Sequence, residues 1–133
     1  MVYNCTIKQN GDMLIVRFPD MPNIQTFGTT QEEALLMAKE ALDACLESDI
    51  SRNIPIPPPA YRKGHPVAVS SHIVLALRLR ELRGEKSQTD IARKLGLSYQ
   101  AYQRLENPRK ANPTVKTLEK IARVYGRELS IAL

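Results

Sequence analysis

Four polar side chains in the C-terminal half have the types and the spacing needed to read DNA bases. They fall within one predicted helix, in which residues three or four apart lie on the same face. A glutamine can pair with adenine N6 and N7, and an arginine can pair with guanine O6 and N7, when such a helix enters the major groove. The candidate base contacts are Tyr99, Gln100, Gln103 and Arg104. Tyr99 could instead meet a thymine methyl group or a phosphate.

Three residues beside this helix could bind the DNA backbone. Ser98 immediately precedes the helix, and Arg109 and Lys110 follow it. Hydroxyl and cationic side chains bind phosphate oxygens, which fixes the position of a protein on the duplex without reading its sequence. We therefore expect these three residues to be phosphate contacts.

The elements around these residues have the order of a helix-turn-helix. Apolar positions of a short helix end at Leu95, and Gly96 can adopt the left-handed conformation that ends a helix. Ser98 can cap a second helix that runs to about Asn107. Ala92 is small enough for the two helices to cross closely, as in a helix-turn-helix. An ordinary helical hairpin in a small bundle is the alternative.

Further elements are expected on both sides of this motif. A helix should begin at Ser70 or Ser71 and run to about Arg83, with Arg78, Arg80 and Arg83 in solvent. The closing segment, residues 127–133, alternates like a short strand. We expect this strand to pair with its counterpart in a second subunit, so that a dimer binds a palindromic site. A strand packed on its own domain is the alternative.

The N-terminal half predicts a small antiparallel sheet with one helix, so the chain is assigned to the α+β class. Thr30 and Glu33 have capping-box spacing, and the helix that they begin has an apolar stripe extending to Cys45. Residues 13–18 are almost continuously apolar, which is typical of a strand that is covered on both faces. Strands are expected at 3–8, 13–18 and 24–27, with a further candidate strand at 67–69.

No pattern in the sequence indicates catalysis, a metal site or a cofactor. Asp12 and Asp20 lie near strand ends, whereas a two-metal nuclease needs several carboxylates that converge on its ions. Cys5 and Cys45 lack the spacing of a zinc site and are expected to be reduced thiols of the core. We therefore predict that the protein is not an enzyme.

Charge divides the chain into two parts with different expected partners. Residues 1–60 carry four basic and eight acidic residues, a net charge of −4, and residues 61–133 carry fifteen and six, a net charge of +9. A basic part suits nucleic acid, and an acidic part suits a basic partner. Five of the nine prolines lie between residues 55 and 66, so this stretch should be an extended, stiff linker. The expected domains are 1–53 and 70–133, joined by a linker at 54–69 that includes the possible last strand.

The residues after the predicted linker resemble the phage-repressor (Xre-type) helix-turn-helix family. The segment from Ser87 to Ser98, SQTDIARKLGLS, is similar to the family's first motif helix and turn, and Arg104-Leu105-Glu106-Asn107 is similar to the end of its recognition helix. Through this resemblance Gln88 corresponds to a phosphate-binding glutamine. Tyr102 stands where the family usually has Ile or Val, so the packing beneath the recognition helix must adjust.

The chain as a whole resembles HicB antitoxins of the helix-turn-helix type. The order of the N-terminal motifs carries the resemblance: Phe18-Pro19-Asp20-Met21-Pro22, then Gly28-Thr29-Thr30, then the linker Ile54-Pro55-Ile56-Pro57. It implies a partial RNase H-like N-terminal domain without nuclease activity, which binds a HicA-type, mRNA-cleaving toxin. It also implies that the C-terminal domain represses its own operon. Asp12 and Asp20 are the candidate toxin contacts, although either could lie on a solvated loop.

Two other functions remain open at this point. The chain could be a stand-alone transcription regulator whose N-terminal domain senses a small ligand, or an RNase H-like nuclease that depends on Asp12 or Asp20. No apolar run approaches the roughly 18 residues of a membrane span, and the N-terminus lacks the pattern of an export signal. We therefore expect a protein of the bacterial cytoplasm.

Overall fold

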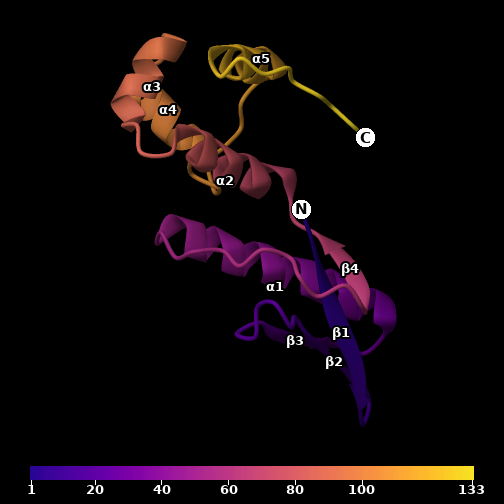
Figure 1. Ribbon diagram of the computed structural model, residues 1–133. Coiled ribbons are helices and arrows are strands. Elements are labelled where there is room, and N and C mark those ends of the chain that lie inside the picture. Colours follow the sequence, from indigo (N-terminus) through magenta and orange to yellow (C-terminus); the bar gives the residue numbers. More distant parts are fainter. The chain divides into compact units, whose positions relative to one another are not determined.

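The computed structural model describes residues 1–133 and divides them into two compact units, 1–74 and 75–133 (Figure 1). It contains four strands and five helices, which confirms the predicted α+β class. No helix is both long enough and apolar enough to cross a membrane. The elements are β1 (Val2–Asn10), β2 (Met13–Arg17), β3 (Gln25–Gly28), α1 (Gln31–Ser51), β4 (His65–Ala68), α2 (Ser71–Arg83), α3 (Gln88–Leu95), α4 (Tyr99–Leu105) and α5 (Val115–Val124).

The N-terminal unit is built on one antiparallel sheet with the strand order β3-β2-β1-β4. Strand β1 is shared between two neighbours along its length. Its first part, from Val2 to Cys5, pairs with β4, and its second part, from Thr6 to Asn10, pairs with β2. The sheet is therefore complete only when β4, which follows the proline-rich stretch, has joined it.

Helix α1 covers one face of this sheet. Thr30 caps it as expected, because its side chain accepts a hydrogen bond from the Glu33 backbone N–H. The buried stripe continues past Cys45 to Leu46 and Ile50, so the helix extends to Ser51. Fully burying such a side chain contributes about 1.5–3 kcal/mol. The stripe consists of Ala34, Ala38, Leu42, Leu46 and Ile50.

The expectation that β2 is covered on both faces is wrong for the single chain. Val16 is fully buried on the α1 side, whereas Met13 is 39% exposed and Arg17 is exposed. The apolar run of β2 thus lies in a sheet of which only one face is covered, so part of the run is exposed.

The proline-rich stretch lies on the N-terminal unit and is held there by side chains. The Tyr3 hydroxyl donates a hydrogen bond to the Pro57 carbonyl. The Asp20 carboxylate accepts hydrogen bonds from the backbone N–H groups of Ala60 and Tyr61, with Oδ2 3.0 Å from both nitrogens. Residues 54–64 are irregular and extended, as the prolines predict, but they pack with the unit that precedes them.

The beginning of α2 is also fixed by α1. Asp43 accepts hydrogen bonds from the backbone N–H and the hydroxyl of Ser70, and Lys39 Nζ donates to the Ala68 carbonyl at 2.8 Å. A carboxylate at a helix N-terminus satisfies unpaired N–H groups and interacts favourably with the helix dipole. The division between the units falls within α2, after Val74, and thus beyond the expected linker.

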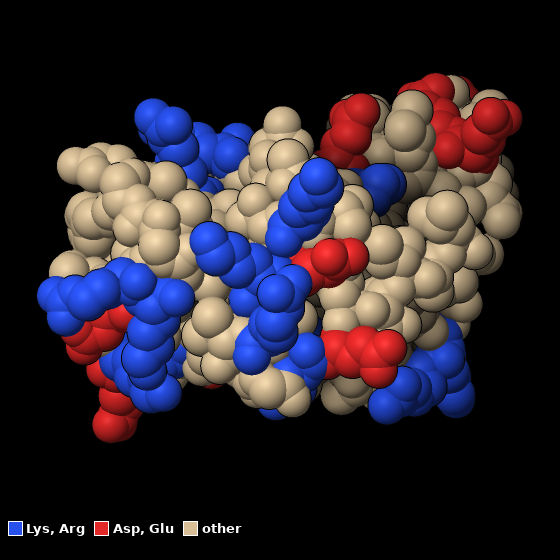
Figure 2. Space-filling view, turned by 90° about the horizontal axis from the view of Figure 1, so that it is seen from above, with Lys and Arg blue, Asp and Glu red and all other residues tan.

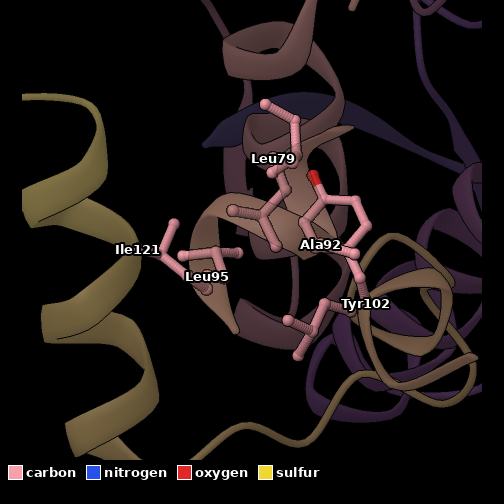
Figure 3. Packing of buried hydrophobic residues seen from close by; sticks show 7 residues of the cluster. Leu79, Ala92, Leu95, Tyr102 and Ile121 are labelled. Carbon is pink, nitrogen blue, oxygen red and sulfur yellow. The ribbon is translucent and has the colours of Figure 1, made fainter. Parts of the chain in front are cut away.

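The C-terminal unit packs its helices around a cluster of apolar side chains (Figure 3). Tyr102 is completely buried in this cluster. The buried members come from α2 to α5: Leu79, Ile91, Ala92, Leu95, Tyr102, Leu105 and Ile121.

The last seven residues form no strand and pair with none. The Arg127 backbone N–H bonds back to the Ala122 carbonyl, and Ile131 is 61% exposed beyond it. The predicted strand at 127–133 is therefore absent from the single chain, and so is the alternative of a strand packed on its own domain.

Candidate nucleic-acid interface

The turn between α3 and α4 has the geometry that a helix-turn-helix requires. Gly96 lies in the left-handed region with φ 67°, and its backbone N–H bonds to carbonyls of α3. The Leu97 N–H then bonds to the Ala92 carbonyl at 2.9 Å, which closes the helix end. A residue with a side chain is strained at this φ, so glycine fits the turn. Ala92 is buried there, as expected for a close helix crossing.

Helix α4 directs one face into the core and the other into solvent. Ser98 caps the helix, because its Oγ accepts a hydrogen bond from the Ala101 N–H at 3.1 Å. Tyr102 and Leu105 are buried. All four candidate base contacts are exposed: Tyr99, Gln100, Gln103 and Arg104.

The candidate phosphate contacts have different environments. Arg109 and Lys110 are exposed in the loop after α4, and the Ser98 hydroxyl is exposed although its oxygen serves as the cap. Gln88 is half-buried, and its Nε2 donates a hydrogen bond to Glu106 Oε1 at 3.2 Å. Gln88 is thus part of an internal network at the edge of the surface.

The centre of this network is a buried ion pair. Glu106 is 1% exposed, and Arg83 binds its two oxygens through Nε at 2.7 Å and Nη2 at 3.0 Å. Arg80 Nε donates to the Glu106 backbone carbonyl. The expectation that Arg80 and Arg83 stay in solvent is therefore wrong, because both lie against the end of α4. Arg78 is exposed, as expected.

The network shifts the ionisation of its members. Burial by itself would raise the pKa of Glu106, but the donors Arg83 and Gln88, together with the nearby Tyr102 hydroxyl, outweigh it and hold that pKa below its ordinary value. Burial and the nearby Glu106 carboxylate raise the pKa of Tyr102. The Tyr102 hydroxyl lies near this carboxylate without reaching full hydrogen-bond geometry, and the Tyr125 hydroxyl is likewise buried without a partner. Glu106 is thus an anion that helps to fix the start of α3 and the end of α4, the two ends of the helix-turn-helix.

The sequence did not identify this ion pair. Arg83 and Glu106 are 23 positions apart, and each follows a leucine of an apolar stripe. One local signal was available. Glu106 directly follows the buried Leu105 at the end of α4, which keeps its side chain close to the core.

The C-terminal unit has the excess of positive charge that a nucleic-acid partner requires. The C-terminal unit carries thirteen basic and six acidic residues, a net charge of +7. Figure 2 shows Lys and Arg side chains in several separate groups, with Asp and Glu side chains between and beside them. A surface of this kind attracts phosphates, and its binding weakens as salt is added.

The acidic candidates of the N-terminal unit are not brought together. Asp12 is exposed in the turn between β1 and β2, whereas Asp20 holds the proline-rich stretch. No group of three or more His, Cys, Asp or Glu side chains is placed to hold a metal ion. Both cysteines are free; Cys5 is buried, and Cys45 is half-buried with its Sγ 3.7 Å from an Asp49 carboxylate oxygen.

Two family profiles together account for almost the whole chain. Residues 3–80 match the family described as HicB_like antitoxin of bacterial toxin-antitoxin system, and residues 78–131 match the family described as Helix-turn-helix.

Curated relatives agree with these profiles. Antitoxin HicB of Escherichia coli strain K12 is 31% identical over 125 residues, which cover 90% of this chain and 88% of the relative. Antitoxin HicB 1 of Photorhabdus laumondii subsp. laumondii is 30% identical over 122 residues, which cover 89% and 77%. Antitoxin HicB 2 of the same organism is 34% identical over 95 residues, which cover 68% and 66%.

Proposed function

Because this chain belongs to the HicB-like family of antitoxins, and its C-terminal unit is a helix-turn-helix domain, we propose that it neutralises a HicA-type mRNA-cleaving toxin and represses the operon that encodes both proteins. The N-terminal unit, whose sheet we assign to a partial RNase H-like fold, binds the toxin without catalysing a reaction. The C-terminal unit reads the operator. Because both mRNA and operator are found in the bacterial cytoplasm, we propose that the protein acts there.

The observation that carries the DNA-binding part is the exposed face of α4. Its base-reading candidates project from a capped helix beyond a left-handed glycine turn, in a unit of net charge +7. Gln100 and Arg104 lie one helical turn apart, so both can reach neighbouring base edges from one position in the major groove. Tyr99 and Gln103 complete the reading face. Each bidentate pair would contribute about 1–3 kcal/mol of discrimination.

The phosphate contacts would hold this helix in register. Gln88 Nε2 has two N–H groups, of which one bonds to Glu106. The other can donate to a phosphate at the start of α3, with the side chain already fixed by the ion pair. Ser98, Arg109 and Lys110 would contact the backbone on either side of α4.

Toxin binding is supported by charge. The N-terminal unit carries six basic and eight acidic residues, a net charge of −2, and six of the acidic residues lie on α1. A protein that cleaves RNA needs a cationic surface, which an acidic unit can cover. Asp12 is the exposed candidate contact. Asp20 would act on the toxin indirectly, since its carboxylate holds residues 60 and 61.

A homodimer, or a larger oligomer built from it, would use the tail. Residues 127–133 belong to no strand in the single chain, so they can form an antiparallel pair with the same residues of a second copy. Two helix-turn-helix domains that are related by a two-fold axis require a palindromic operator. Ile131→Arg should yield monomers in size-exclusion chromatography with light scattering. Ser130→Arg is the matched control, because it adds the same charge to the neighbouring polar position.

The deciding experiment combines toxin capture and DNA binding. The chain should co-purify with its HicA-type toxin and stop that toxin from degrading RNA. Gln100→Ala and Arg104→Ala should weaken operator binding about 5- to 150-fold, following from 1–3 kcal/mol per base contact, with much smaller losses on unrelated DNA. Arg123→Ala, which removes an exposed cation from α5, is the control for charge alone. Equal losses on both DNAs would show that α4 does not read bases.

A further inference from the structure

The sheet of the N-terminal unit has a second face, opposite α1, which no element of that unit covers. Directly paired residues of an antiparallel sheet share a face, so the register identifies this surface. Met13 is 39% exposed on it, Val2 is 44% exposed and Phe27 is 53% exposed. We call this surface the bare face. It consists of Met13, Ile15 and Arg17 of β2 and of the residues of β1, β3 and β4 that share their face through the pairing register.

Three of these residues form a row across the sheet. Lys8 on β1 pairs with Ile15 on β2, and Ile15 pairs with Phe27 on β3. Neighbouring strands are about 4.8 Å apart, so the Lys8 and Phe27 backbones are separated by about 10 Å. The next row places Arg17 beside Gln25, and Arg17 Nε donates to Gln25 Oε1 at 3.3 Å. A hollow of about 290 Å³ is lined by residues of β1 and β2, among them Lys8, Ile15 and Arg17.

The charge of the bare face is opposite to that of the unit as a whole. It carries two cations, Lys8 and Arg17, and no carboxylate, whereas α1 on the other side carries six of the unit's eight acidic residues. An occupant should therefore be anionic. The occupant should also carry a flat apolar group, because the exposed Phe27 ring offers a flat apolar surface on the same face as those cations.

We propose that the bare face binds a short single-stranded RNA segment. One base would stack on Phe27, and phosphates on either side of it would lie against Lys8 and Arg17. Stacking on an aromatic ring beside cations is the general means by which open sheets hold unpaired nucleotides. The amides of Asn4 and Gln25 can bond to base edges.

Other occupants fit the charge less well. A cationic protein surface, such as that of the proposed toxin, would meet Lys8 and Arg17 with like charge. A second copy docked face to face would bring the same cations together. The RNA site is thus separate from toxin capture and does not depend on it.

Fluorescence anisotropy of the full-length protein with a labelled oligouridine of about ten nucleotides tests the proposal. Saturating unlabelled double-stranded DNA occupies the C-terminal unit during the titration. Phe27→Ala should weaken RNA binding about 5- to 150-fold, as expected when 1–3 kcal/mol of stacking is lost. Phe27→Tyr should keep it. Leu36→Ala, on the exposed side of α1 at 58% exposure, should change nothing.

Salt dependence provides an independent readout. For a single strand, two phosphate contacts give a slope of about −1.4 in a plot of log K against log salt. The double variant Lys8→Gln with Arg17→Gln should lose this salt dependence. The proposal is overturned if double-stranded DNA displaces all of the RNA, or if Phe27→Ala binds RNA as Leu36→Ala does. It is also overturned if Phe27→Ala loses the toxin while the wild-type protein binds no RNA, because the bare face would then be a protein interface. Circular dichroism confirms that each variant is folded.

Discussion

The buried pair of Glu106 and Arg83 should control the stability of the DNA-binding unit. Glu106→Gln keeps the shape of the side chain and removes its charge, which leaves the Arg83 guanidinium without its anion. Breaking a buried pair in this way costs about 3–5 kcal/mol. Arg83 is 21% exposed and can regain some water, so we expect a loss at or below the lower limit of this range, about 2–3 kcal/mol.

A loss of this size is large for a small unit. Domains are commonly stable by about 5–15 kcal/mol, and small ones lie near the lower limit. Each kcal/mol shifts the melting temperature of a domain of this size by about 4–8 °C. The transition of the C-terminal unit should therefore move down by roughly 10–20 °C, while that of the N-terminal unit stays in place.

Scanning calorimetry of the full-length protein measures this shift. Glu119→Gln removes an exposed carboxylate from α5 of the same unit and is the matched control. Combining Glu106→Leu with Arg83→Met should restore part of the loss, since an apolar replacement of the whole pair leaves no buried charge unpaired. If Glu106→Gln melts within a degree or two of Glu119→Gln, the pair does not stabilise the unit and the reasoning fails.

Three further outcomes follow from the structure. The pKa of Glu106 is held below its ordinary value of 4.5, so its stabilisation is fully present above that pH and is lost as the pH falls through the lowered folded-state pKa; melting curves of wild type and Glu106→Gln should converge in acid. Gly96→Ala should destabilise the C-terminal unit by about 1–2 kcal/mol, because alanine is strained at φ 67°, and a chemical denaturation midpoint that does not move would contradict this. Asp20→Ala should lose about 1–3 kcal/mol and open residues 54–64 to limited proteolysis, whereas Asp12→Ala, in an exposed turn, should leave the cleavage rate unchanged.

The elements that the sequence predicts best are those with strong local signals. The cap at Thr30, the left-handed Gly96 and the cap at Ser98 each act within three or four residues, and all three appear in the structure as expected. The α+β class follows from the same local patterns. The exposure of one face of α4 was also predictable, since its apolar residues Tyr102 and Leu105 lie on the other face.

The features that were missed depend on contacts between distant residues. Nothing near Asp20 indicates that it binds the backbone 40 residues later, and nothing near Arg83 indicates Glu106. The bare face was missed for a related reason. A continuous apolar run indicates that both faces of a strand prefer burial. It does not indicate whether the element that covers the second face belongs to the same chain.

The position of β4 has a consequence for synthesis on the ribosome. The first part of β1 has its hydrogen-bonding partner at residues 65–68, after the proline-rich stretch. Chains emerge from the N-terminus onward, so the nascent sheet keeps one unsatisfied edge until half of the protein has been translated. Premature termination before residue 68 would therefore release a fragment with an open strand edge, suited to aggregation or degradation, and one that cannot complete the N-terminal sheet.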